Sequence, residues 1–109
     1  MEKITRIGIL MDSDIKIEVI LDNLPAGKTM ADIDFSVAFS TANGKLTMEK
    51  SKLYSLEDGG KTRYIACFNS SKVGKGDIIM TVTASIPDAG FAGGLRKDVV
   101  KADTMVTVL

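Results

Sequence analysis

The side chains best suited to chemistry in this sequence are carboxylates that occur in neighbouring pairs. The pairs are Asp12 with Asp14, Asp32 with Asp34, and Glu57 with Asp58. Carboxylate oxygens can bind a hard cation, but a calcium loop needs more oxygen donors within a dozen residues than any of these stretches offers. Aspartates also favour turns and strand ends, where they bond to nearby backbone groups. We therefore interpret the three pairs as structural, and we expect no metal site and no cofactor.

Histidine, the commonest general base of enzymes, is absent from the sequence, and cysteine occurs once. Without histidine, neither a Ser-His nor a Cys-His nucleophile pair can be built. The single Cys67 excludes an intramolecular disulfide and a cysteine-based metal site. It lies in the apolar run Tyr64-Ile65-Ala66-Cys67-Phe68, which predicts a small buried side chain. No catalytic residue is predicted, and we expect a protein that is not an enzyme.

Two short motifs match functional signatures but lack their context. Gly27-Lys28-Thr29 matches the end of a phosphate-binding loop, but Asp22 stands where that loop has its first glycine. Asn69-Ser70-Ser71 matches the glycosylation pattern, which has meaning only in a secreted eukaryotic protein. Neither motif is taken as a site.

The charge balance and the apolar runs limit the partners. Basic and acidic residues number 14 each, so the formal net charge is zero and no long-range field gathers phosphates or anionic lipids. The basic pairs lack the interleaved aromatic residues of a single-strand binding platform, and we interpret them as solvated loop charges. These pairs are Lys50 with Lys52, Lys72 with Lys75, and Arg96 with Lys97. No run approaches the ~20 apolar residues of a membrane span, and the first residues contain no signal-peptide run. We expect neither a nucleic-acid partner nor a membrane partner. We also expect the chain to be made in a cytoplasm, and whether it stays there or is released by lysis is left open.

Apolar residues alternate with polar ones in several stretches, which predicts strands with one buried face. The clearest alternating sets are Ile15, Ile17, Val19 and Leu21; Ile33, Phe35, Val37 and Phe39; and Ile78, Met80, Val82, Ala84 and Ile86. Weaker strands are predicted over 4–11, 45–49, 52–56, 61–68 and 104–109, with a short one over 99–101. Seven or eight short strands predict a single all-β domain over residues 1–109. The immunoglobulin-like antiparallel β-sandwich is the expected form, with a small barrel as the alternative.

Turn residues separate these strands. Asn43-Gly44, after Ala42, predicts a tight hairpin in which both residues take positive φ, and Asp58-Gly59-Gly60 predicts a second hairpin. Residues 69–77 are predicted to form a loop with one helical turn, and 87–97 a glycine-rich loop.

The glycine-rich loop holds the candidate interface residues, which are Phe91, Leu95, Arg96, Gly93 and Gly94. A loop in solvent would normally be more polar than this one. Either the loop folds back and caps the end of the sandwich, which is the interpretation we favour, or Phe91 and Leu95 dock onto another subunit.

The order of three segments resembles that of a known group of proteins. The segments are Asp34-Phe35-Ser36-Val37-Ala38-Phe39-Ser40-Thr41, then residues 69–76, then Asp88-Ala89-Gly90-Phe91-Ala92-Gly93-Gly94-Leu95-Arg96 before a final apolar strand. They resemble small immunoglobulin-like proteins encoded in phages and prophages of gut Bacteroidales and, more distantly, the N-terminal domain of phage baseplate upper proteins. The resemblance implies a β-sandwich that serves as a structural component of a virion, in the tail, the baseplate or the capsid decoration.

Two other functions stay open at this point. A glycan- or receptor-binding adhesin module would need an exposed Tyr54, Tyr64 or Phe91 beside carboxylates in a groove. A small metal-dependent enzyme would have to be built on the aspartate pairs. The leading hypothesis is a virion protein whose partners are other virion proteins or further copies of itself, bound through strand edges and end loops.

Overall fold

The computed structural model describes residues 5–22 and 24–109, and in this part of the chain the alternating segments form eight strands and four short 3-10 turns. The strands are β1 (Ile7–Ile9), β2 (Asp14–Val19), β3 (Asp34–Thr41), β4 (Gly44–Glu49), β5 (Tyr54–Asp58), β6 (Lys61–Asn69), β7 (Gly76–Pro87) and β8 (Leu95–Val108). The 3-10 turns are η1 (Met30–Asp32), η2 (Lys50–Lys52), η3 (Ser70–Lys72) and η4 (Ala92–Gly94). The predicted helical turn in residues 69–77 is confirmed by η3.

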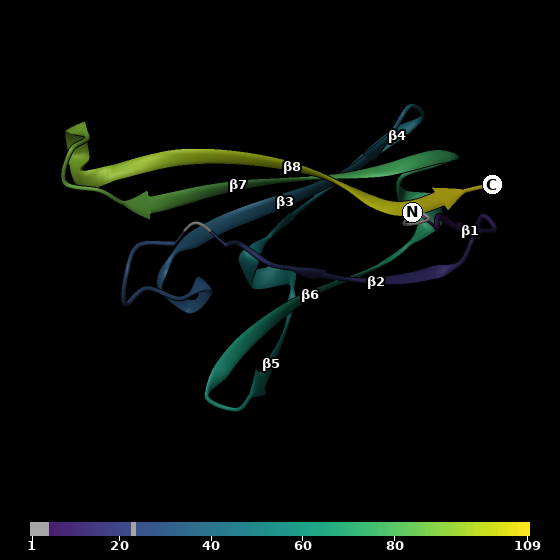
Figure 1. Ribbon diagram of the computed structural model, residues 1–109. Helices are drawn as coiled ribbons and strands as arrows, with labels where there is room; N and C mark the ends of the chain where they lie inside the picture. The colour runs from purple at the N-terminus through teal and green to yellow at the C-terminus, as the bar shows by residue number, and fades with distance from the viewer. Residues whose placement is uncertain (1–4, 23) are drawn as a thin grey trace.

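The strands form two sheets that pack face to face (Figure 1). One sheet has the order β1-β8-β7-β3-β4 and the other β2-β6-β5. This arrangement confirms the predicted immunoglobulin-like sandwich. One pair departs from the antiparallel prediction, because β1 runs parallel to β8. The two strands are far apart in sequence, so no hairpin forces them to run in opposite directions.

The core consists of the inward-facing residues of both sheets, and the three strong alternating patterns are confirmed. Phe39 is fully buried against Phe68 of the opposite sheet, with ring centroids 4.6 Å apart. Phe35 meets Tyr64 edge-on at 5.4 Å. These inter-sheet aromatic pairs fix how the sheets stack, because aromatic contacts favour tilted and edge-on geometries.

The prediction that Cys67 is buried is wrong, since its side chain is exposed. Tyr64, Ala66 and Phe68 of β6 all face the core, so Cys67 must face outwards. There it lies opposite Lys16 of β2. Every residue of the run is apolar, so composition alone could not show which ones turn inwards.

The first hairpin forms at the predicted place but for a different reason. Thr41 pairs with Gly44, so the turn residues are Ala42 and Asn43, and neither has positive φ. Gly44 is required by close packing instead, because a Cβ there would lie 2.7 Å from the carbonyl oxygen of Val73. In the second hairpin Gly59 and Gly60 have φ of 60° and 81°, which confirms the turn predicted there.

Three predicted strands differ clearly in extent. β5 covers Tyr54–Asp58 rather than 52–56, since Lys50–Lys52 form the 3-10 turn η2. The first strand covers Ile7–Ile9 rather than 4–11, with Ile4 outside the described residues. The last strand is continuous over Leu95–Val108 instead of a short piece and a separate final strand. The predicted loop of residues 87–97 is correspondingly shorter. Antiparallel pairing with β7 from Pro87–Leu95 onwards holds this charged stretch in strand form.

Candidate protein–protein interface

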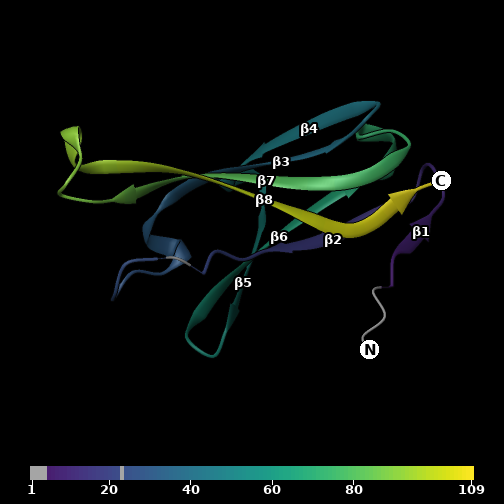
Figure 2. The ribbon, with the colours of Figure 1, turned by 45° about the horizontal axis from the view of Figure 1, so that its top comes forward.

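Strand β8 has β7 beside it along its length, but on its other side it has a partner only near its C-terminal end. There β1 pairs with Val106, Thr107 and Val108. Among the described residues, no strand lies beside 95–105 on that side, as Figures 1 and 2 show. An edge of this kind offers backbone N–H and C=O groups to a strand from another molecule. We call residues 95–105 the free edge.

Apolar side chains gather on the free edge and at the hairpin tip beside it. Leu95, Val99 and Val100 are 55%, 59% and 44% exposed. Phe91, in the turn between β7 and β8, is 53% exposed. Single exposed apolar residues are ordinary, but several along one edge mark a contact surface.

The tip is held by its own backbone and points away from the sandwich. The N–H of Asp88 donates to the carbonyl of Gly94 (2.9 Å), and the N–H of Gly94 donates to the carbonyl of Phe91 (2.9 Å). Gly93 and Gly94 have φ of 80° and 72°, a conformation that L side chains rarely adopt. The expectation that the tip caps the sandwich is wrong, since both Phe91 and Leu95 stay exposed. The backbone turn is completed within the hairpin and does not fold back.

Arg96, predicted as an interface residue, is a brace within the hairpin. Its guanidinium donates to Asp88 (2.8 Å) and to Asp98 (3.0 and 3.2 Å). The N–H of Gly90 also donates to Asp88 (2.9 Å), and this bond, followed by the one from Arg96, lowers the pKa of Asp88. Hydrogen bonds to Asp98 and then Asp88 raise the pKa of Arg96. The brace orders the tip that carries Phe91.

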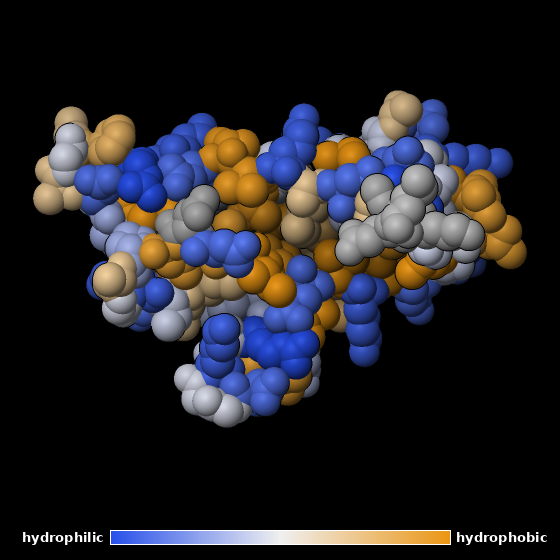
Figure 3. Space-filling view, viewed as in Figure 1, coloured by the Kyte–Doolittle hydropathy of each residue, from blue (hydrophilic) through white to orange (hydrophobic). Residues whose placement is uncertain are grey.

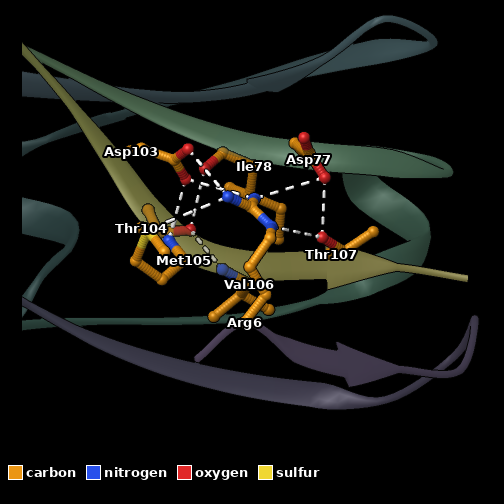
Figure 4. Close-up of polar contacts among 8 residues, drawn as sticks. All are labelled: Arg6, Asp77, Ile78, Asp103, Thr104, Met105, Val106 and Thr107. Carbon is orange, nitrogen blue, oxygen red and sulfur yellow. Dashed lines mark hydrogen bonds and ion pairs between the residues drawn. The ribbon is translucent and has the colours of Figure 1, made fainter. Parts of the chain in front are cut away.

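At the other end of β8, Arg6, which directly precedes β1, links β1 to β8 and β7 (Figure 4). Its guanidinium donates to Asp103 (2.9 and 3.2 Å) and to the hydroxyl of Thr107 (3.0 Å), and it lies 3.2 Å from a carboxylate oxygen of Asp77. The hydrogen bond from Arg6, followed by one from the N–H of Met105, lowers the pKa of Asp103. Met105, the last residue of the free edge, has φ of 64°, and this local break in the extended backbone directly precedes the part of β8 that β1 covers.

A small apolar hollow lies where β2 ends beside β8. Its volume is about 170 Å³, and its lining includes Ile20, Leu24, Ile86 and Val100. In Figure 3 hydrophobic side chains, drawn in orange, gather along the boundary between the two sheets on this face. Ile20 is 61% exposed, so the apolar surface of the free edge continues towards β2.

A larger groove of about 800 Å³ lies between β5–β6 and the start of β3. Phe35 and Tyr64 line it, but the ammonium of Lys50 lies over both rings, at 5.5 and 5.3 Å from their centroids. Lys50 also donates to three backbone carbonyls, so it is not the solvated loop charge that we predicted. Tyr54, the exposed tyrosine, is not among the lining residues. The rings in the groove are therefore not a free stacking surface for a sugar.

Four of the six paired carboxylates accept hydrogen bonds from neighbouring groups. Asp32 accepts hydrogen bonds from both the N–H and the hydroxyl of Thr29 (2.8 and 3.1 Å), and these bonds lower its pKa. Asp14 accepts from Asn69, Glu57 from Thr62, and Asp58 from Arg63. Within residues 5–22 and 24–109, no group of three or more His, Cys, Asp or Glu side chains could hold a metal ion.

The residues of the tip stand out in the sequence, but of the free edge beside it only a short strand over 99–101 is predicted. Val99 and Val100 stand in the run Lys97-Asp98-Val99-Val100-Lys101, where the charges hide the strand pattern. Two adjacent valines inside a charged stretch were the available signal, because an edge strand often combines an apolar centre with charged flanks.

In the described part of the chain, no helix is long and apolar enough to cross a membrane. Compared with protein-family models, with curated proteins and with solved structures, the chain gave no significant match in any of the three searches.

Proposed function

We propose that this protein is a structural component of a phage virion that acts by binding other proteins and does not catalyse a reaction. The observation that carries the proposal is the apolar surface of the β7–β8 hairpin, formed by Phe91 at the tip and by Leu95, Val99 and Val100 on the free edge. Tip and edge adjoin, so one partner can contact both.

The rigidity of the tip supports a role in binding. The turn is fixed by backbone hydrogen bonds and by Arg96, so Phe91 is held in place before any partner arrives. A side chain that is already ordered loses less conformational entropy on binding, which leaves more of the contact energy for affinity. Aromatic residues are also the most frequent energetic anchors of protein interfaces.

The virion as the setting is supported by the resemblance to small immunoglobulin-like proteins of Bacteroidales phages. A tail, baseplate or capsid-decoration position is compatible with a neutral domain that offers an open strand edge with apolar side chains. On this proposal the chain is made in the cytoplasm of the bacterial host and ends in the particle, where its partners are other virion proteins or further copies of itself.

The test is to purify particles from a lysed culture and to quantify this chain in them by mass spectrometry. We expect Phe91→Ser to lower its amount in the particle several-fold. Tyr54→Ser is the matched control, because Tyr54 is an equally exposed aromatic residue (59%) on β5, in the other sheet.

Two results would contradict the proposal. One is absence of the wild-type chain from every particle. The other is equal incorporation of the Phe91→Ser variant and the wild type. Binding to a glycan array that is lost in Tyr54→Ser would favour the adhesin module instead.

A further inference from the structure

We propose that the occupant of the free edge is a second copy of this chain, paired antiparallel so that a two-fold axis passes between the two copies of Val100. The two five-stranded sheets would then continue into one another across the β8 edges. This inference rests on the proposed function, because it names one partner of the same hairpin surface.

Symmetry restricts how two copies of one edge can pair. An antiparallel pair within one continuous sheet has its two-fold axis perpendicular to the sheet, so a single residue faces its own copy at the centre. If that residue is Val100, then Val99 lies opposite Lys101 of the second copy and Lys97 lies opposite Asp103. Each of these contacts occurs twice.

The charges along the edge favour a two-fold centre at Val100 over a centre at a neighbouring residue. A centre at Val99 places Lys97 opposite Lys101, which brings like charges together twice. A centre at Asp98 or at Lys101 places that charged residue opposite itself. Like charges directly opposite one another destabilise a sheet, whereas opposite charges stabilise it. A centre at Val100 pairs no like charges and brings Lys97 to Asp103.

The extent of the edge is compatible with the same centre. Residues 95–105 lie between the start of β8 and the first residue that pairs with β1, Val106. The register with β7 shifts beyond Asp103 and Met105 takes a φ of 64°, so a pair centred on Val100 uses residues 97–103, which are in regular strand conformation. A centre at Ala102 would push the second copy towards Val106, where β1 already occupies the edge.

The Arg6 cluster is suited to receive Lys97 of the second copy. Two carboxylates, Asp77 and Asp103, share the single guanidinium of Arg6, so the cluster has a formal charge of −1. Lys97, which is exposed on the same edge, would neutralise it. Charge complementarity of this kind fixes the register of a contact more than its strength.

The apolar contact lies at the axis. Val100 lines the hollow beside Ile20, so its side chain is on the core side of the edge. Two copies of Val100 facing one another would extend that hollow into a shared apolar strip. Val99, on the other face, would lie against the aliphatic stem of Lys101, as long cationic side chains commonly do.

A matched pair of charge variants tests the register. Val99→Lys places like charges opposite Lys101, and Val99→Glu places opposite charges there. The wild-type net charge is zero, so each variant has a net charge of magnitude one and general repulsion is the same in both. Val99 is exposed and its partner on β7 is the uncharged Thr83, so neither variant disturbs the fold.

The measurement is the dissociation constant of the dimer by analytical ultracentrifugation. We expect wild type to dimerise and Val99→Lys to dissociate roughly 10-fold more readily than Val99→Glu, because the altered pair occurs twice. Val99→Lys with Lys101→Glu should restore the affinity. A wild-type chain that stays monomeric up to millimolar concentration, or equal constants for the two variants, would overturn the proposal.

A cysteine cross-link tests the axis directly. In a Cys67→Ser background, Val100→Cys should couple two copies through a short bifunctional thiol reagent. Ala102→Cys should not, because its two copies would lie four residues out of register, about 14 Å apart along the strand. Coupling at Ala102 but not at Val100 would reject the axis. A negative result in the ultracentrifugation or in the cross-linking experiment would reject self-pairing. It would not affect the particle experiment, which tests the virion function separately.

Discussion

The two ends of β8 belong to one strand but meet their surroundings in opposite ways. At Val106–Val108 the strand is covered by β1, Val108 is buried at 2% exposure, and Arg6 ties the two strands together. At Leu95 to Val100 the same strand has apolar side chains and an unoccupied edge. The covered end stabilises the domain, whereas we infer that the free edge is kept for a partner.

The break between the ends is local. Met105 takes a positive φ and its N–H donates to Asp103 (2.9 Å), which is also held by Arg6. The hydroxyl of Thr104 donates to the carbonyl of Ile78 on β7 (2.7 Å). The strand is thus anchored to β7 and to β1 at the point where the free edge stops, so binding at the edge need not disturb the covered end.

The largest contrast is expected from the same substitution at the two ends. Val108→Asp buries a charge without a partner and should cost about 4 kcal/mol or more in the free energy of unfolding. Val99→Asp, on the exposed edge, should change it by less than about 0.5 kcal/mol. Urea unfolding followed by circular dichroism measures both. Similar losses in the two variants would mean that the free edge is part of the stabilising structure.

A smaller effect is expected at the tip. Gly94→Ala forces a side chain into a positive φ and should cost about 1–2 kcal/mol, since no atom lies within 4 Å to clash with the new Cβ. Gly59→Ala, with φ of 60° in the other hairpin, is the matched control. We expect a similar loss of stability in both, measured by urea unfolding, but weaker incorporation into particles only for Gly94→Ala. Equal incorporation of the Gly94→Ala and Gly59→Ala variants would mean that the tip is not part of the interface.

Removing the brace at the covered end should loosen β1 without unfolding the sandwich. In Arg6→Gln, Asp77 and Asp103 lose their cationic partner, and we expect faster amide hydrogen exchange at Ile7–Ile9 and Val106–Val108. Arg63→Gln breaks the equivalent ion pairs with Glu18 and Asp58 on the other sheet and serves as the control. If exchange at β1 is the same in both variants, Arg6 does not hold the strand.

The smallest expected effect is the pH dependence of amide protection at β1 in acid. The folded pKa of Asp103 lies below its ordinary value of 3.8, so its bonds stabilise the fold fully above that value and are lost as the pH falls through the lower folded pKa. We expect the protection factors of the β1 amides, which correct for the intrinsic exchange rate at each pH, to fall below pH 3.8 in wild type and to be much less sensitive to pH in Arg6→Gln. A titration by nuclear magnetic resonance that shows an unshifted Asp103 would contradict this.

The same two regions show what could be predicted from the sequence. Strands with one buried face were predicted well, because Phe35, Val37 and Phe39 alternate with polar residues. Of the free edge only a short strand over 99–101 was predicted, because a strand with β7 on one side only buries little and tolerates charges at almost every position. Its structure depends on pairing with β7, which no local pattern encodes.

The candidate site was predicted in part for a related reason. Phe91 and Leu95 were identified because large apolar residues are unusual in a glycine-rich loop, but their exposure was not foreseen. That outcome depends on the hydrogen bonds that Asp88 makes with Gly94 and Arg96, which close the turn on itself. Three residues separated in sequence determine it together, so composition could not decide between a cap and a contact.

The most direct test of the account is amide hydrogen exchange of the wild-type chain at increasing protein concentration. We expect protection of the outward-facing amides in residues 95–105 to rise with concentration, while Ile7–Ile9 and Val106–Val108 keep the same protection throughout. Unchanged exchange along 95–105 from micromolar to millimolar concentration would contradict the claim that the free edge binds a second copy.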